Sequence, residues 1–249
     1  MKVEVKVAAM SADLVFRSDM GVELMKSSAG DADVVWSARV STQGEASVQA
    51  VDEDPERSAG LIRYLMSNRH GTPFEHNSMT FLVTAPIFVF REFQRHRIGW
   101  SYNEESGRYR ELQPVFYVPG PDRKLRQEGK PGHYDFVDAG TELTERAVVA
   151  ATRAYVAAHE AYREMLDAGV AREVARTVLP VGIYSSMYAT CNARSLMSFL
   201  SLRTQAENST FPSYPQREIE MVAEQMESHL ARLMPITYAA FVAAGRVSP

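Results

Sequence analysis

A dense run of basic and polar residues in the middle of the chain, RHRIGWSYNEESGRY, holds the groups best suited to bind an anion. Arg95, His96 and Arg97 are adjacent, and three neighbouring basic groups repel one another unless acids or a bound anion compensate them. Eight residues separate Arg97 from Ser106 and Gly107, whose backbone N–H groups could hold a phosphate. One interpretation of this run is therefore a phosphate site.

The alternative interpretation is a solvated ion-pair cluster in which nearby carboxylates neutralise the basic groups. A helix that begins at Pro86 would put Glu92, Arg95 and His96 on one face, at spacings of three and four. Glu104 would add a further carboxylate from the loop, beside Glu105. Composition alone leaves both interpretations open.

Four further arginines are candidates for ligand contacts. Arg172 and Arg176 are one helical turn apart, and Glu173 between them could form a simple surface pair. Arg194 and Arg203 flank the apolar face of a predicted helix, where an unpaired guanidinium would be costly. An acidic partner or a ligand is therefore expected beside this last pair.

Histidine and cysteine give weaker signals. His70 and His76 together with His96 fit no common zinc spacing, so we expect structural imidazoles and no metal. Cys191 is the single cysteine, which rules out an intramolecular disulfide and fits a reducing cytoplasm. No basic residue flanks it, so we expect a buried, inert thiol. The sequence also lacks a Gly-rich dinucleotide fingerprint and a phosphate-loop motif.

The composition bounds the class of protein. With 249 residues, 45% hydrophobic and 23% charged, the chain is long and apolar enough for a folded domain. A net charge of −4 argues against a partner of duplex nucleic acid. Arg outnumbers Lys among the 27 basic residues, mostly through base composition, although Arg forks also suit phosphates. The N-terminal residues lack the apolar run of a signal peptide, and we expect no membrane partner.

The predicted elements must position these groups. Strands are expected early and helices late, which favours an α+β fold. We expect strands at 2–8, 79–85 and 115–118; helices that begin at Asp54-Pro55 and end before Gly71, that begin at Pro86, and that cover 143 to about 169, 170–179, 192–203 and 219–233; and connections at 99–110, 119–135 and 204–215. The helix at 143–169 should bury a stripe of mainly alanines between Leu143 and Met165.

Arg95-His96-Arg97 and Ser106 resemble the signature of flavin-dependent thymidylate synthases, the ThyX family. Three further segments resemble family motifs in the same order: HGTPFEH at 70–76, REVAR at 172–176 followed by Leu179-Pro180, and NARSLM at 192–197 followed by LSLR at 200–203. The resemblance covers roughly residues 20 to 245, so agreement by chance is excluded in practice.

The resemblance implies a single catalytic domain over 1–249, with a central, mostly antiparallel sheet flanked by helices, assembled as a homotetramer with shared flavin sites. It implies FAD, NADPH as reductant and methylenetetrahydrofolate as carbon donor. Carried over residue by residue, it implies FAD contacts from Thr72, Arg95, His96, Arg97, Glu104, Asn192, Arg194 and Ser198. It implies that the uridylate nucleotide contacts Glu92, Arg95, Glu104, Ser106, Gly107, Arg108, Arg176 and Arg203, with Arg203 as the catalytic residue that draws charge onto the N3 side of the pyrimidine.

Several positions depart from the family pattern. Eight residues rather than the commoner seven precede Ser106, Glu92 stands where many members have Gln, and Ser198 replaces a frequent Asn. The stretch 204–215 is longer than in compact members and lacks a His soon after Arg203. These differences bear on the sugar pocket. We expect conversion of dUMP to dTMP, with UMP as a second substrate. Dedicated methylation of UMP in nucleoside specialised metabolism is the alternative. A non-enzymatic, Arg-rich regulator that binds nucleotide or RNA is the competing hypothesis from another class.

Overall fold

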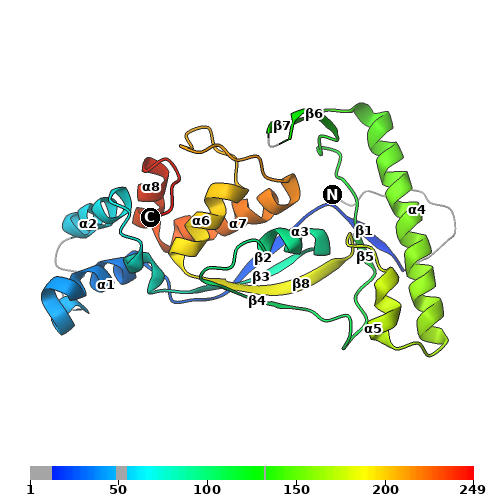
Figure 1. Ribbon diagram of the computed structural model, residues 1–249, viewed down its shortest axis with the longest axis horizontal. Helices are drawn as coiled ribbons and strands as arrows, with labels where there is room; N and C mark the ends of the chain where they lie inside the picture. Colours follow the sequence, from blue (N-terminus) through cyan, green and yellow to red (C-terminus); the bar gives the residue numbers. More distant parts are fainter. Residues whose placement is uncertain (1–12, 49–54, 132) are drawn as a thin grey trace. The chain divides into compact units, whose positions relative to one another are not determined.

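The computed structural model describes residues 13–48, 55–131 and 133–249 (Figure 1). The strands are β1 (Val15–Arg17), β2 (Gly21–Ser27), β3 (Met79–Pro86), β4 (Trp100–Glu104), β5 (Val115–Tyr117), β6 (Arg126–Lys130), β7 (His133–Val137) and β8 (Tyr184–Cys191). The α-helices are α1 (Asp31–Gln43), α2 (Pro55–Ser67), α3 (Ile87–Phe93), α4 (Gly140–Asp167), α5 (Arg172–Ala175), α6 (Ala193–Arg203), α7 (Arg217–Leu233) and α8 (Pro235–Ala243). The strand predicted over 2–8 lies outside the described residues.

The strands of the described residues form three sheets. The largest has the order β2-β3-β8-β4, while β1 pairs with β5 in parallel and β6 pairs with β7 in antiparallel fashion. In β3, Met79, Phe81, Val83 and Ala85 are fully buried, as their alternation with polar residues predicts. The fold is a mixture of helices with antiparallel sheet, which confirms the expected class.

The chain divides into two compact units. Among the described residues, the first unit comprises 13–20, 84–94, 104–131 and 133–187, and the second comprises 21–48, 55–83, 95–103 and 188–249. Three strands, β3, β4 and β8, contribute residues to both ranges. That residues 1–249 form one catalytic domain stays a prediction.

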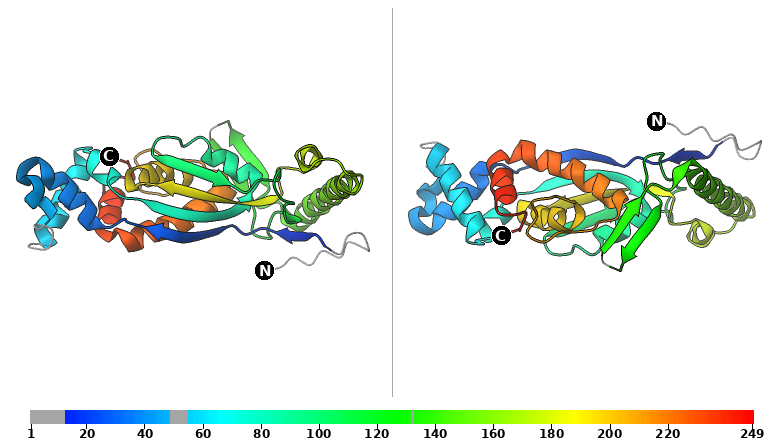
Figure 2. Two further views of the ribbon diagram at one scale, coloured as in Figure 1. Left: turned by 90° about the horizontal axis from the view of Figure 1, so that it is seen from below. Right: turned by 90° about the horizontal axis from the view of Figure 1, so that it is seen from above.

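The first unit is built around the long helix α4, with α5 alongside it (Figure 2). The predicted helix is confirmed, but its buried stripe is not the predicted one. Val148, Val156 and Tyr162 are buried, whereas Leu143 is exposed, because branched and aromatic side chains bring more apolar area to the contacts than alanines do.

The second unit packs α6, α7 and α8 together (Figure 1). The predicted helices at 192–203 and 219–233 are confirmed, and α8 follows them. Ile219, Val222, Met226 and Leu230 of α7 are fully buried. The carboxylate of Asp31 caps α8, since its oxygens accept from the N–H groups of residues 236 and 237 at 2.9 and 2.8 Å.

Two predicted connections are wrong. Residues 119–135 contain β6 and the start of β7, which pair as a hairpin across Lys130 and His133. Residues 99–110 contain β4, in which the rings of Trp100 and Tyr102 stack with centroids 5.7 Å apart. Aromatic residues two positions apart share one face of a strand, and this pairing outweighs the polar residues around them.

Helix α2 ends at Ser67, before Gly71 as predicted. Arg69, rather than Gly71, takes the left-handed conformation after the helix, with a φ of 59°. The N–H of His70 donates to the carbonyl of Leu65, and the N–H of Arg69 donates to that of Met66. This pair of bonds closes the helix without a glycine, which leaves Gly71 for the contact described below.

Among the described residues, none of the helices combines the length and apolar character that a bilayer-spanning segment needs.

Candidate functional site

The basic segment 95–98 of the second unit packs onto α6. The ring of His96 lies 4.9 Å from that of Phe199, in an edge-on arrangement. The Nε of Arg203 donates to the Nε2 of His96 at 3.0 Å, and the Oγ of Ser195 donates to the carbonyl of Ile98 at 2.9 Å. Helix α6 therefore holds this segment at both its first and its last turn.

The conformation of the segment corrects one prediction. Helix α3 ends at Phe93, so Arg95 and His96 do not continue its face beside Glu92. The chain instead turns through Gly99, whose φ is 70°. A Cβ at that position would lie 2.1 Å from the Oγ of Ser195, so the close approach to α6 requires glycine there.

The charge of the segment is lower than three adjacent basic residues suggest. Burial, with a smaller contribution from the Arg203 cation, lowers the pKa of His96 to about 4. The imidazole is therefore neutral at pH 7, and Arg95 and Arg97 are the two exposed cations. The predicted repulsion is reduced to that between these two groups.

Arg194 attaches the segment 71–75 to α6. Its Nη1 contacts the Oε1 of Glu75 at 2.5 Å, and its Nε donates to the carbonyl of Pro249 at 2.7 Å. A Cβ on Gly71 would lie 2.4 Å from the Cζ of Arg194, so the guanidinium passes directly over this glycine. The predicted acidic partner of Arg194 is thus Glu75, and Thr72 is exposed beside it.

Two more of the predicted flavin contacts lie at the start and on the open face of α6. Asn192 is its N-cap, and the side-chain oxygen accepts from the N–H of Ser195 at 2.8 Å. Ser198 is exposed one turn after Arg194. The second unit thus contains Thr72, Arg95, His96, Arg97, Asn192, Arg194, Ser198 and Arg203.

The remaining predicted residues, Glu92, Glu104, Ser106, Gly107, Arg108 and Arg176, lie in the first unit. The N–H of Tyr109 donates to the carbonyl of Ser106 at 3.0 Å, which forms a tight turn. Gly107 is buried, and a Cβ on it would lie 3.4 Å from the Cδ of Arg176. The turn is thereby brought against Arg176.

Glu104 has unusual electrostatics. Burial raises the pKa of its carboxyl, while Ser185 and the cations of Arg91 and Arg176 oppose that shift. The neighbouring Glu105 contacts the Nε of Arg110 at 3.1 Å. Carboxylate and guanidinium groups therefore lie together around Glu104.

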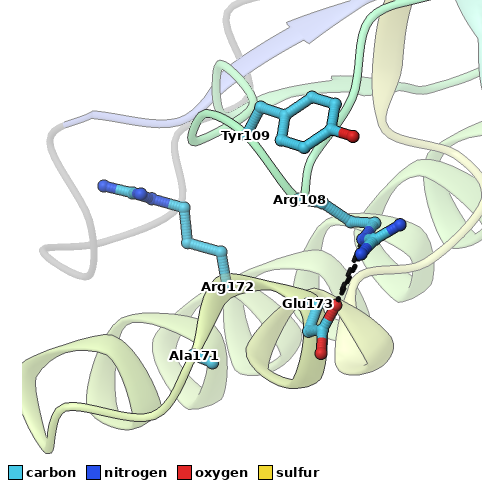
Figure 3. Close-up of a pocket in the computed structure, with 5 residues that line it drawn as sticks. All are labelled: Arg108, Tyr109, Ala171, Arg172 and Glu173. Atoms are coloured by element: carbon cyan, nitrogen blue, oxygen red, sulfur yellow. Dashed lines mark hydrogen bonds and ion pairs between the residues drawn. The ribbon is translucent and has the colours of Figure 1, made fainter.

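An open pocket of roughly 330 Å³ lies beside this turn (Figure 3). It is lined by Arg108, Tyr109, Ala171, Arg172 and Glu173. The Nη2 of Arg108 lies 3.0 Å from the Oε2 of Glu173, so Glu173 does not pair with its helical neighbours as predicted. Figure 3 shows Arg172 directed away from Glu173. The pocket is lined by two guanidinium groups, of which that of Arg108 is paired with Glu173.

Sequence reasoning missed several supporting residues. Tyr109 lines the pocket, and Phe199 packs against both His96 and Trp100. The sequence signal that could have identified Tyr109 is its place in the motif itself.

The two histidines at 70 and 76 contact aromatic rings: His70 that of Tyr64, and His76 that of Trp36. The described part of the chain contains no group of three side chains suited to a metal. Cys191 is buried, as predicted.

Comparison with known proteins identifies relatives over most of the chain. The sequence model of the Thy1 family, described as thymidylate synthase complementing protein, matches residues 23–236. A flavin-dependent thymidylate synthase of Streptomyces avermitilis is 68% identical over 237 residues, which cover 94% of this chain and 95% of the relative. One from Tropheryma whipplei is 55% identical over 95% of this chain and 98% of its own.

Solved structures show the same relationship in three dimensions. Crystal structures of the UMP/dUMP methylase PolB from Streptomyces cacaoi contain 5-Br UMP or 5-Br dUMP. The first matches this chain with a TM-score of 0.88 and 58% identity, over 95% of this chain and all of that one. The second has a TM-score of 0.89 and 60% identity, over 94% and 99%.

Proposed function

The chain belongs to the Thy1 family of thymidylate synthase complementing proteins, and we propose on that premise that it is a flavin-dependent enzyme that methylates C5 of a uridylate nucleotide. The observation that carries this proposal is similarity over nearly the whole chain to flavin-dependent thymidylate synthases and to a UMP/dUMP methylase. Such similarity disfavours the hypothesis of a non-enzymatic regulator.

The second unit supplies the groups that suit FAD. Arg95 and Arg97 are exposed cations, as a diphosphate requires, and exposed Thr72 and Ser198 add hydroxyl groups. Arg194 is held in place by Glu75 and would contact the cofactor from α6. When bound, FAD supplies the hydride that completes the methyl group. NADPH as the reductant and methylenetetrahydrofolate as the carbon donor belong to the same proposal.

The first unit supplies the groups that suit the nucleotide. Arg108 and Arg176 provide guanidinium forks for a phosphate, and the turn at Ser106-Gly107 brings backbone close to Arg176. Glu104, with Glu92, would accept hydrogen bonds from the nucleotide. Arg95 and Arg203 of the second unit complete the proposed set.

Arg203 is the proposed catalytic residue. C5 of uracil is a weak nucleophile unless negative charge develops in the ring, and a guanidinium near N3 stabilises that charge. Cys191 is not placed for the alternative of attack on C6, since it is buried and burial raises the pKa of its thiol. The neutral ring of His96 accepts a hydrogen bond from the Nε of Arg203 and so holds the guanidinium at the end of α6.

Both dUMP and UMP are proposed substrates. The related methylase was crystallised with an analogue of each nucleotide, so a pocket of this fold can hold either sugar. A dedicated role in UMP methylation for nucleoside specialised metabolism is the second candidate function, favoured by the same observation. A homotetramer with shared flavin sites and a cytoplasmic location complete the proposal.

The visible spectrum of the purified protein provides the first test. We expect a yellow protein whose colour bleaches when NADPH is added. Supplied with NADPH and methylenetetrahydrofolate, it should convert dUMP to dTMP and also methylate UMP. A colourless protein that yields no product from either nucleotide would contradict the proposal, and product from UMP alone would select the second candidate.

A further inference from the structure

A buried ion pair lies at the C-terminal end of the second unit. The Nη1 and Nη2 of Arg246 contact the two carboxylate oxygens of Glu227 at 2.7 and 2.9 Å. The hydroxyl of Tyr238 donates to the same carboxylate at 2.8 Å, and the Arg246 guanidinium lies over the ring of Phe241. Only 7% of Arg246 is exposed.

Arg246 reaches from this pair to the end of α6. Its Nη2 donates to the Oγ1 of Thr204 at 2.7 Å. That hydroxyl donates in turn to the carbonyl of Leu200 at 2.8 Å, which also accepts from the N–H of Thr204 at 3.0 Å. Thr204 therefore closes the last turn of the helix, and it directly follows Arg203.

The extended loop 204–215 is attached at the same place. The Oγ of Ser213 donates to the carbonyl of Thr204 at 2.7 Å. The N–H of Thr210 donates to the carbonyl of Gly245 at 2.9 Å, next to Arg246. The loop, the C-terminal turn and the end of α6 thus form one hydrogen-bonded cluster.

Stability alone is a weak explanation for this arrangement. The side chains of Arg246 and Glu227 are only 7% and 16% exposed, so both charges lose most of their hydration. Ion pairs of this kind are often replaceable by apolar side chains without loss of stability. Arg246 also adopts the left-handed conformation, with a φ of 60°, which disfavours residues other than glycine. Charge and backbone strain are thus concentrated at Arg246, which contacts Thr204, the residue that follows Arg203. Strained backbone of this kind is found most often at functional sites.

We propose that Arg246, Glu227 and Thr204 form a positioning network that sets the last turn of α6 and so directs the guanidinium of Arg203. This inference rests on the proposed function of Arg203 as the catalytic residue. Arg203 is the final residue of α6, so an altered final turn moves its Cα and its contact with His96. A shift of about 1 Å in such a group can lower a rate by roughly 100-fold.

The test replaces the Thr204 hydroxyl and keeps the side-chain shape. Thr204→Val removes both hydrogen bonds, whereas Thr204→Ser retains the hydroxyl. The matched control is Thr237→Val, because Thr237 is also fully buried and its Oγ1 donates to Asp31 at 2.7 Å, away from Arg203. Each holoenzyme is assayed for kcat, nucleotide KM, flavin content and melting temperature.

We expect kcat of Thr204→Val to fall about tenfold or more, with KM changed less than about threefold and flavin retained. Thr204→Ser should stay within about twofold of the wild type, and Thr237→Val should lower the melting temperature without this loss of kcat. Equal kcat in Thr204→Val and Thr237→Val would overturn the proposal, as would a serine variant as defective as the valine variant.

A second variant keeps the proposal testable if Thr204→Val does not fold. Arg246→Lys retains the charge, but its single ammonium cannot span both oxygens of Glu227 and reach Thr204 as the guanidinium fork does. We expect the same selective loss of kcat in this variant, and an unchanged kcat would count against the network.

A crystal structure separates this inference from the proposed function. In Thr204→Val, the contact of 3.0 Å between the Nε of Arg203 and the Nε2 of His96 should be lost, while Thr237→Val retains it. This measurement needs no catalytic activity. Retention of the contact in Thr204→Val overturns the positioning role, whereas a wild type without flavin or product overturns only the proposed function.

Discussion

The imidazole of His96 accepts a hydrogen bond from the guanidinium of Arg203, although 107 positions separate the two residues in the chain. The acceptor nitrogen must be unprotonated, so the ring carries its proton on Nδ1. Burial and the Arg203 cation, which lower the pKa of His96 to about 4, keep it in that state. This contact joins the basic segment to the end of α6.

The neutral state of His96 makes the stability of the protein dependent on pH. In the unfolded chain the imidazole titrates near its usual pKa of about 6.5, above its folded value of about 4. Protons therefore bind the unfolded state first, and the stability present above pH 6.5 is lost as the pH falls toward 4. From pH 7 to pH 5, the wild type should lose about 1 kcal/mol more than His96→Asn, after allowance for partial exposure.

Denaturant unfolding at several pH values measures this difference. His133→Asn is the control, because His133 is exposed in β7. Parallel pH profiles for the wild type and His96→Asn would contradict the assignment of a neutral, buried imidazole.

The Arg203→Lys variant should distinguish the contribution of the positive charge at this position from that of the guanidinium geometry. Lysine keeps the cation but lacks the planar fork and the Nε donor, so we expect kcat to fall by roughly 100- to 1,000-fold, with fold and flavin retained. Arg232→Lys is a matched control, since the Nη2 of Arg232 also contacts a histidine, His229, at 2.8 Å. Steady-state kinetics measure the effect, and equal activity in the two variants would remove Arg203 from its proposed role.

Gly71→Ala should affect the flavin rather than the fold. The new methyl group would lie 2.4 Å from the Cζ of Arg194, and the flexible guanidinium would move aside at little cost in stability. We expect a lower flavin-to-protein ratio, measured by absorbance, with a melting temperature close to that of the wild type. Gly60→Ala is the control, because its Cβ would meet nothing closer than 3.9 Å; an identical flavin ratio in both variants would contradict a flavin contact by Arg194.

Glu104→Gln should stabilise the protein while it weakens nucleotide binding. Burial raises the pKa of Glu104, so its contribution to stability is present at low pH and is lost as the pH rises through the folded value. The glutamine variant should therefore melt about 1–3 °C above the wild type at pH 7, with a smaller difference at pH 4.

Glu105→Gln serves as its neighbour control and should show no such gain, because Glu105 is paired with Arg110. A Glu104→Gln variant that melts below the wild type at pH 7 would show that its carboxylate is stabilised as a charge.

Glu173→Gln should increase nucleotide affinity. Glu173 contacts the Arg108 guanidinium, which is proposed to bind the nucleotide, so the carboxylate competes with it. This ion pair is exposed, and we expect Kd to fall by at most about fivefold, as measured by calorimetry. Glu111→Gln disrupts a comparable pair with Arg163 at 2.8 Å and should leave Kd unchanged; equal values for both variants would exclude the competition.

The local sequence pattern was sufficient to predict the buried face of a strand or helix that buries one side only. The alternation in β3 and the spacing of Ile219, Val222 and Met226 in α7 predicted their buried faces correctly. The same reasoning did not identify β8, in which Ser185 on the buried side and Tyr188 on the exposed side break the alternation of apolar and polar residues. Its place between β3 and β4 comes from pairing with distant strands, which a local window does not contain.

The sequence by itself determined the family, because four motifs in order specify residues whose types the chemistry requires. It also determined the apolar faces of the main helices, since their period is local. Only the tertiary structure decided that His96 is neutral, that Glu173 pairs with Arg108 and that Thr204 links Arg203 to Arg246. Charge state and partner depend on burial and on groups brought together from distant parts of the chain, and neither has a periodicity that can be read along it.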